Sequence, residues 1–334
     1  MFLSGCRPDS NNEEIENEVV EEEVTNEQEE NIDHETETNE TNETNETNEA
    51  LSFDEWFADS DFIDNPEILP AVNEMSVEEI VHYYQEDYSI EDDWYAVSYT
   101  NLLTDDTYTY REEEEYIAAS TIKTLIAMTF YDLVEKGGIT LDTLIPYYPT
   151  QLQDGGGQIT AAAMAGQAES AYPLEYVIQE LIVASDNTAW VMLRYYYNEF
   201  IGDFNEAMNQ ALPEVDYPIE MLDDNETTTT YLEAILLELL SKDYYAPILE
   251  FMRQADEDMF LLHYVDNDHP VKYGLLNGLH HHMGIYKMDE EPIYTLVFLT
   301  SNLDVDTADL FMGGINLQLV VQNEYAYYLA TNDE

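Results

Sequence analysis

The sequence has little of three things: cysteine, basic residues and long apolar segments. Cys6 is the single cysteine among 334 residues, so an intrachain disulfide is excluded. Lysine and arginine number nine against 73 acidic residues, which gives a formal net charge of −64. Such a chain is not expected to bind nucleic acid or anionic lipid through basic patches. Because no apolar run approaches the length of a bilayer-crossing helix, no membrane-spanning segment is expected either.

The negative charge is not confined to the N-terminal part of the chain. The first 50 residues contain 18 of the acidic residues and one basic residue, Arg7, which leaves about −47 on the remainder. A folded surface with this charge favours adaptation to high salt or alkaline surroundings, and an acidic protein of an ordinary habitat is the alternative.

The N-terminal residues fall into two segments. Residues 1–6 end in Leu-Ser-Gly-Cys, which is similar to the lipobox at which bacterial lipoproteins are cleaved and lipidated. Since only five residues precede Cys6, we interpret this segment as a truncated signal, with a chance match as the alternative. Residues 7–50 are acidic and contain four TNE repeats at 38–49, which predicts a disordered tether. A lipid on Cys6 would then be the protein's membrane contact and would anchor it outside the cell.

Ser120 and Lys123 lie within a strong helix pattern at 116–138. Apolar residues recur there at the three-and-four spacing of a buried stripe, which Gly137 and Gly138 end. Ser120 is expected at the first turn, where free N–H groups favour a developing oxyanion. Lys123 would share its face and could act as its base if burial lowers the lysine pKa. Taken alone the pattern is weak, because a serine N-cap followed by a surface lysine explains it as well.

Two further motifs follow in order along the chain. Ser185-Asp186-Asn187 separates two predicted helices, and Lys272-Tyr273-Gly274 opens a predicted strand. A helix–helix turn closed by its own side chains is the alternative interpretation of the first.

The motifs S-x-x-K, S-D-N and K-T-G, in this order, are the set found in class A β-lactamases and penicillin-binding proteins. From about residue 77 to the C-terminus the sequence resembles that family, with the flanking phrases AASTIK, GGGQI, LIVASDNTAWVML and VKYG followed by HHHMGIY. The resemblance implies an α+β fold, in which an antiparallel sheet flanked by N- and C-terminal helices packs against an all-helical insert. The predicted domain spans 51–334, with its α/β part at 76–119 and 260–334 and its helical part at 120–259.

The resemblance also implies a role for each motif residue. Ser120 would be the acylated nucleophile, Lys123 its general base, and Ser185 the proton donor to the leaving nitrogen. Backbone N–H groups of Ser120 and Leu275 would form the oxyanion hole. The catalytic set would comprise Ser120, Lys123, Ser185 and Lys272, the last supplying positive potential for a substrate carboxylate, and the substrate-binding set Asn187, Tyr273, Gly274 and Leu275.

Two departures from the family pattern bear on function. Tyr273 replaces a threonine or serine whose hydroxyl helps to bind the β-lactam carboxylate, and its ring is expected to fill space that a small residue leaves open. Deacylation in the family uses a loop glutamate in an E-x-x-L-N context, and Glu206 is one residue out of that register. Glu206 is kept as a possible deacylating acid, with a solvated surface acid as the alternative for it and for Glu214.

The remaining pattern predicts a loop at 202–226, strands at 270–276, 279–287 and 293–300, and a closing helix at 307–328. The three consecutive histidines at 280–282 are interpreted as strand positions, because neighbours on a strand point to opposite faces and cannot all reach one ion. No metal or other cofactor is expected.

The leading functional hypothesis is a monomeric serine hydrolase at the cell surface, acylated on Ser120 by a β-lactam or a peptidoglycan D-alanyl peptide and deacylated slowly. The competing hypothesis is a binding module that keeps the fold and its pocket without turnover. The intact serine and lysine motifs favour the enzyme, whereas Tyr273 and the missing loop glutamate favour the module.

Overall fold

The computed structural model describes residues 50–332 except 70, 256–258 and 266–267. Two compact units divide the chain, 1–47 and 48–334, and the described residues belong to the second. The predicted signal at 1–6 with Cys6, and the predicted tether up to residue 49, lie outside the described residues. The predicted boundary between α/β and helical parts stays a prediction.

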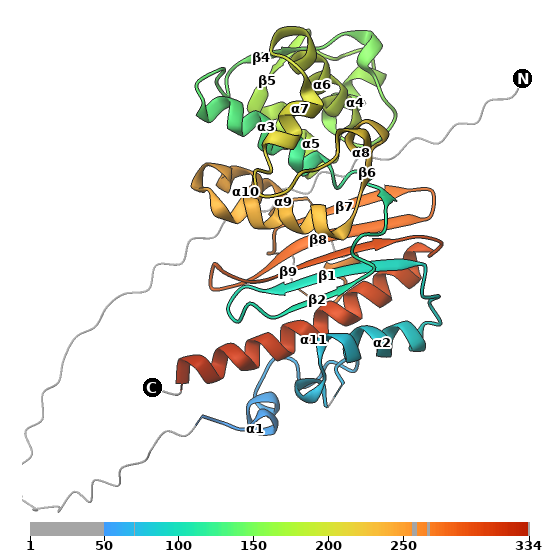
Figure 1. The fold of residues 1–334 in the computed structure, drawn as a ribbon, viewed down its shortest axis with the longest axis vertical. Coiled ribbons are helices and arrows are strands. Elements are labelled where there is room, and N and C mark those ends of the chain that lie inside the picture. Colours follow the sequence, from blue (N-terminus) through green and yellow to red (C-terminus); the bar gives the residue numbers. More distant parts are fainter. Residues whose placement is uncertain (1–49, 70, 256–258, 266–267, 333–334) are drawn as a thin grey trace, which may run out of the picture. The chain divides into compact units, whose positions relative to one another are not determined.

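The main sheet has five antiparallel strands in the order β2-β1-β9-β8-β7 (Figure 1). These strands are β1 (Tyr95–Asn101), β2 (Thr107–Tyr110), β7 (Val271–Leu276), β8 (Leu279–Met288) and β9 (Glu291–Thr300). The N-terminal hairpin therefore pairs with strands that come after the helical insert, because β1 lies beside β9 with Tyr95 opposite Thr300. β7 is an edge strand, and its register places Gly274 opposite His281.

Helices cover both faces of this sheet, as Figure 1 shows. On one face lie α2 (Val77–Asp87) and the long C-terminal α11 (Val305–Asn332), with α1 (Phe53–Ala58) near the end of α11. On the other lies α9 (Thr229–Ser241), which contacts β1, β8 and β9. Beside α9 lies α10 (Ala246–Arg253), which also contacts β7 (Figure 1). The remaining helices are α3 (Lys123–Glu135), α4 (Gln158–Met164), α5 (Leu174–Val183), α6 (Asn187–Phe200), α7 (Phe204–Gln210) and α8 (Ile219–Asp224).

Short strand pairs and single 3-10 turns complete the described elements. One pair joins β3 (Tyr116–Ile117) to β6 (Glu226–Thr227), and the other joins β4 (Leu144–Pro146) to β5 (Ala171–Pro173). The 3-10 turns are η1 (Val72–Glu74), η2 (Pro149–Gln151), η3 (Asp243–Tyr245) and η4 (Phe260–Leu262).

Two apolar clusters form on the two sides of the sheet. Alternation along β1 sends Ala96 into the cluster with the helical insert and Val97 into the cluster with α2 and α11. Phe298 and Phe311 pack edge-to-face in the second cluster, with ring centroids 5.6 Å apart. A fully buried side chain of this size contributes about 1.5–3 kcal/mol. The sheet is thus buried on both faces, which fixes the register of β7 and β8 beside the insert.

The α+β architecture predicted from the sequence is confirmed, and the predicted late strands and closing helix end within about four residues of β7, β8, β9 and α11. The loop prediction at 202–226 is wrong, because the segment contains α7 and α8. Asp203 caps α7 by accepting a hydrogen bond from the Glu206 N–H at 3.0 Å. Such short helices, held by a cap and by tertiary packing, carry too few apolar residues for a visible stripe.

Within the described residues, none of the helices combines the length and the apolar character that crossing a bilayer requires.

Candidate active site

Ser120 lies in the tight turns that connect β3 to α3. The Thr121 N–H donates to the Ala118 carbonyl at 3.2 Å and the Lys123 N–H donates to the Ser120 carbonyl at 3.3 Å, so the chain winds as 3-10 turns before α3 begins at Lys123. Ser120 therefore precedes the helix by three residues instead of occupying its first turn. Ala119 has φ of +50°, a left-handed conformation that costs an alanine about 1–2 kcal/mol.

The Lys123 amine is buried and directed at the Ser185-Asp186-Asn187 turn. The side chain is 3% exposed, and its Nζ donates to the Ser185 carbonyl at 2.5 Å, the Ser185 Oγ at 3.0 Å and the Asn187 Oδ1 at 2.7 Å. Burial lowers the pKa of Lys123 to about 7, although the nearby Asp186 carboxylate opposes the shift. Within the described residues the Ser120 hydroxyl has no hydrogen-bond partner of its own, so it is available to an incoming group.

Asp186 holds this turn from behind. It is fully buried and caps α6, with Oδ1 accepting from the Ala189 N–H at 3.0 Å and from the Thr160 hydroxyl at 2.7 Å. Its Oδ2 accepts from the Thr160 N–H at 2.9 Å. Ser185 has φ of +52°, and this conformation turns both its carbonyl and its hydroxyl toward Lys123. These hydrogen bonds from Asp186 brace the turn that holds Ser185 and Asn187.

Two glycines of the GGGQI phrase allow α4 to approach the same turn. A Cβ at Gly157, whose φ is +95°, would collide with the Asp186 Oδ2. A Cβ at Gly155 would lie 2.6 Å from the Asn187 Nδ2, which instead donates to the Asp154 carbonyl at 2.7 Å. Any larger residue at these positions would displace the two side chains that hold or contact Lys123.

A third glycine brings the edge strand β7 against the Ser120 turn. A Cβ at Gly274 would lie 3.1 Å from the Ala118 carbonyl oxygen and 3.2 Å from the Ala119 Cβ, closer than ordinary contacts. The glycine therefore permits the backbone of Leu275 to lie beside Ser120, as an oxyanion hole built from these two residues requires.

His281, on β8, links β3 to the end of β9. Its Nε2 lies 2.9 Å from the Ile117 carbonyl, and its Nδ1 accepts from the Thr300 N–H at 3.1 Å. Burial lowers the pKa of His281 to about 4, so the ring is neutral, with its proton on Nε2 for Ile117. His282 points to the opposite face, where its Nδ1 accepts from the Leu261 N–H at 3.1 Å. Within the described stretches of the chain, no cluster of histidine, cysteine and acidic side chains could hold a metal ion.

A pocket of about 200 Å³ opens beside Ser120. Of the predicted site residues it brings together Ser120, Lys123, Asn187 and Leu275, with Ser185 reached through Lys123. The rest of its lining consists of Ala119, Ile122, Gln153, Trp190, Asn225 and Leu276. The sequence analysis did not identify Gln153, Trp190 or Asn225 as pocket residues. Trp190 could have been predicted from the sequence, since it lies three residues after Asn187 on the same helix face.

Lys272 and Tyr273 do not line this pocket. Lys272 is fully buried, and its Nζ lies 4.0 Å from the centre of the Tyr273 ring and 3.4 Å from the Tyr273 carbonyl. The Tyr273 ring packs against the apolar cluster on the α11 side of the sheet. Contrary to the sequence-based expectation, the ring does not fill the pocket, because alternation along β7 turns it to the other face. This geometry gives no support to contact between the Lys272 ammonium and substrate.

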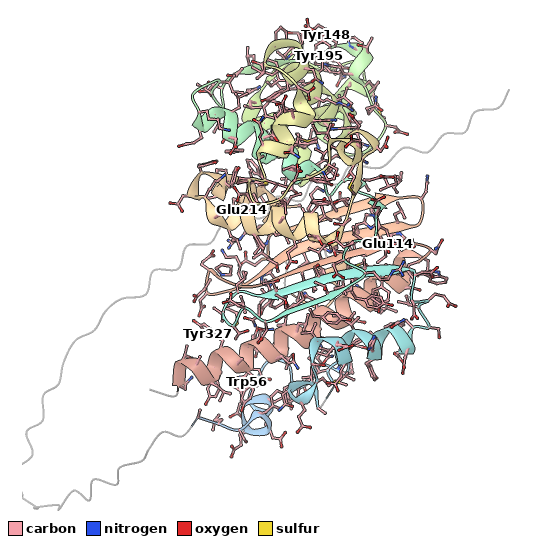
Figure 2. The ribbon with its side chains drawn as sticks, viewed as in Figure 1. Trp56, Glu114, Tyr148, Tyr195, Glu214 and Tyr327 are labelled. Carbon is pink, nitrogen blue, oxygen red and sulfur yellow. The ribbon has the colours of Figure 1, made fainter. Side chains whose placement is uncertain are left out.

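The two candidate deacylating acids lie away from the pocket. Glu206 is exposed on α7, where its carboxylate accepts from the Gln210 side chain at 3.3 Å. Glu214, labelled in Figure 2, is exposed as well. Within the described residues no carboxylate lines the pocket. The arrangement thus provides a hydroxyl, a buried amine of pKa about 7 and side-chain amides, but no acid positioned to activate a water.

Comparison with known proteins agrees with this architecture. The family model described as β-lactamase enzyme family matches residues 79–321. Among curated proteins, none matches the sequence. Among solved structures, a β-lactamase from Sphaerobacter thermophilus is 17% identical with a TM-score of 0.61, covering 74% of this chain and 96% of that one. PBP-A is 19% identical with a TM-score of 0.57, covering 75% and 95%. A mutant of PBP-A, solved as an acyl-enzyme complex with penicillin G, is 19% identical with a TM-score of 0.58, covering 75% and 96%.

Proposed function

The chain belongs to the β-lactamase enzyme family, and we propose that it is a serine hydrolase acylated on Ser120 by a β-lactam or by a peptidoglycan D-alanyl peptide. The observation that carries the proposal is the state of Lys123. A lysine 3% exposed with a pKa of about 7 is half neutral at neutral pH, so it can accept a proton from the serine that lines the same pocket. A surface lysine after a helix cap would keep its ordinary pKa.

Acylation would proceed by a balanced exchange of bonds and protons. The Ser120 Oγ forms an ester bond to the acyl carbon, its proton passes to the neutral Lys123 amine, and the carbon–nitrogen bond of the substrate breaks. The leaving nitrogen takes a proton from Ser185, which recovers one from Lys123 across their 3.0 Å contact. The Ser120 and Leu275 N–H groups would stabilise the oxyanion.

Deacylation would be the slow step. Hydrolysis of the ester needs a water activated by a base within hydrogen-bond reach, and the described lining of the pocket has no carboxylate for that purpose. Loss of one general base costs about 10²–10⁴ in the step it serves. The ester on Ser120 would therefore be long-lived, and a penicillin should give a stoichiometric burst followed by slow turnover.

Intact-mass spectrometry after incubation with a penicillin tests this proposal. The wild-type protein should gain the whole mass of the penicillin, because the opened ring stays attached to the acyl group. Ser120→Ala should abolish the gain, and Lys123→Ala should reduce it nearly as far, since the two groups act as a unit. The control is Ser170→Ala, which removes an exposed serine outside the pocket.

A mass gain that survives Ser120→Ala would contradict the assignment of the nucleophile. Rapid steady-state hydrolysis of a chromogenic cephalosporin without a burst would contradict slow deacylation. In that case Glu206 and Glu214 would be the first acids to replace.

The competing proposal of a binding module also has an observation in its favour, namely that Lys272 is fully buried and does not line the pocket. A module would bind a penicillin without any covalent gain in mass, so the same experiment separates the two proposals.

We also propose that the protein is held at the outer cell surface by a lipid on Cys6. The proposal derives from the lipobox-like residues before Cys6 and from the acidic segment after it. Metabolic labelling with a palmitate analogue in a bacterial host should mark the wild-type protein. Cys6→Ser should remove the label.

A further inference from the structure

Arg194 lacks the acidic partner that the other basic side chains at the surface have. In a chain with 73 acidic and nine basic residues, a cation at the surface is expected to lie beside a carboxylate. Lys123 and Lys272 are buried. Five of the others form ion pairs with carboxylates, namely Arg111, Lys136, Lys242, Arg253 and Lys287. Arg194 is exposed and makes no ion pair or hydrogen bond to another described residue, so its guanidinium is available to a ligand.

Arg194 lines a pocket that adjoins the one beside Ser120. The pocket of about 200 Å³ at Ser120 and a smaller one of about 60 Å³ share Ile122, Trp190 and Asn225. Arg194 lines the smaller pocket and follows Trp190 by one turn of α6, on the same helix face. A substrate group that passes from the Ser120 pocket along the Trp190 side chain therefore comes to the Arg194 guanidinium.

The order of residues along α6 indicates which half of an acyl donor would face Arg194. Ser185 lies just before α6 and would protonate the leaving nitrogen, so the leaving half lies at the N-terminal end of the helix. Asn187 and Trp190 follow, and Arg194 comes seven residues after Asn187, about 10 Å further along the axis. Because helix side chains lean toward the N-terminus, the Arg194 side chain shortens this gap. The acyl half, which extends away from the leaving nitrogen, is therefore the part that Arg194 can bind.

Asp223 also lines the smaller pocket, but its carboxylate is held by another side chain. Its Oδ1 accepts a hydrogen bond from the Asn205 Nδ2 at 2.5 Å, which directs it toward α7. Within the described residues no ion pair joins Asp223 to Arg194, so the guanidinium can bind a carboxylate from solvent through two parallel N–H···O bonds. An anionic group that contacts Arg194 would thus gain an interaction that a neutral group of the same length lacks.

We propose that Arg194 determines specificity by binding a carboxylate in the acyl half of the substrate. The substrate class is a β-lactam or D-alanyl peptide whose acyl chain carries a carboxylate a few carbons from the reacting carbonyl. This inference rests on the proposed acylation of Ser120 and narrows its substrate. It concerns the acyl half alone and leaves recognition of a carboxylate on the leaving half unchanged. Arg194 takes no part in the exchange of bonds and protons at Ser120.

Two penicillins of equal acyl-chain length test the inference. One has a glutaryl side chain, which ends in a carboxylate, and the other has a pentanoyl side chain, which ends in a methyl group. The measurement is the ratio of the glutaryl to the pentanoyl rate of mass gain on Ser120. Arg194→Gln should lower this ratio about tenfold relative to the wild-type protein, because hydrogen bonds between charged groups are stronger than neutral ones.

Two further variants serve as controls. Lys136→Gln removes one positive charge from the surface outside both pockets and should leave the ratio unchanged, which excludes an effect of net charge. Arg194→Lys keeps the charge but not the planar pair of donors, so its ratio should lie between those of the wild-type protein and Arg194→Gln.

A ratio that stays the same in Arg194→Gln would overturn the inference, since it would show that Arg194 is a solvated surface charge. If Arg194→Gln does not fold, as judged by circular dichroism, Arg194→Lys decides, and its ratio must then fall below that of the wild-type protein. If neither penicillin adds mass to Ser120, the proposed function fails and the inference fails with it. The two failures are distinguishable, because the first still gives a covalent product and the second gives none.

Discussion

The pKa of Lys123 predicts how acylation depends on pH. Only the neutral amine can accept the Ser120 proton, so the acylation rate should rise about tenfold per pH unit below pH 7 and level off above about pH 8. The probe is benzylpenicillin, whose carboxylic acid is fully ionised throughout this range. The measurement is the rate of mass gain on Ser120 between pH 5.5 and pH 9.5.

The size of the effect on the acylation rate follows from how far the pKa of Lys123 is lowered. An amine of ordinary pKa 10.5 would be neutral in roughly one molecule in 3,000 at pH 7, whereas an amine of pKa about 7 is neutral in half of them. The shift corresponds to about 5 kcal/mol, which the fold supplies by burying Lys123. With an exposed lysine of ordinary pKa in place of Lys123, only a small fraction of the molecules would therefore hold a neutral amine able to accept the Ser120 proton at neutral pH.

Lys123→Arg is the control for this assignment. Arginine keeps the positive charge at every accessible pH, so the variant should lose acylation by about 10²–10⁴ and show no inflection near pH 7. A wild-type rate that keeps rising about tenfold per pH unit up to pH 9.5 would show that Lys123 is not desolvated as the structure describes. An inflection near pH 7 that persists in Lys123→Arg would assign the titration to another group.

Two further predictions concern stability. Gly157→Ala should lower the free energy of unfolding in urea by about 2 kcal/mol more than Gly166→Ala does, because both glycines have positive φ but only a Cβ at 157 would collide with Asp186; equal losses would show that the turn yields without cost. The melting temperature should rise as sodium chloride is raised from 0.15 M to 2 M, because residues 51–334 carry a net charge of about −47 and salt screens the repulsion among these charges. A flat or falling melting temperature would show that the charges are already compensated.

The fold was predictable because its strongest signals are long and periodic. The apolar stripe before Gly137 corresponds to α3, and the alternating segments on either side of Asn277-Gly278 form the hairpin of β7 and β8. The resemblance of the motifs to a known family then implied one antiparallel sheet packed against an all-helical insert, which periodicity cannot give. The helices α7 and α8 were missed because six or seven residues contain too few turns for a stripe.

The site was predictable only in part. Ser120 and Lys123 are three residues apart, so their spacing alone places them together, whereas Asn187 is 64 residues from Lys123 and was placed beside it by the motif resemblance. The burial of Lys272 could not be predicted, since it depends on how its side chain packs at the edge of the sheet. The position of Asn225 could not be predicted either. Asn225 lines the pocket because it is the left-handed residue that ends α8, and α8 was not expected from the sequence.

The conformation of Ala119 bears on the choice between enzyme and binding module. Asparagine and aspartate tolerate positive φ through local hydrogen bonds, but the methyl group of alanine offers no such compensation. The strain is held by neighbours on both sides, since the Ala118 N–H donates to the Asn225 carbonyl at 2.7 Å and His281 bonds the Ile117 carbonyl. A pocket that only binds a ligand has no need to fix the residue before Ser120 at a cost in stability. A nucleophile does, because its hydroxyl and backbone N–H must both face the reacting carbon before the substrate arrives. The strained turn therefore favours the enzyme.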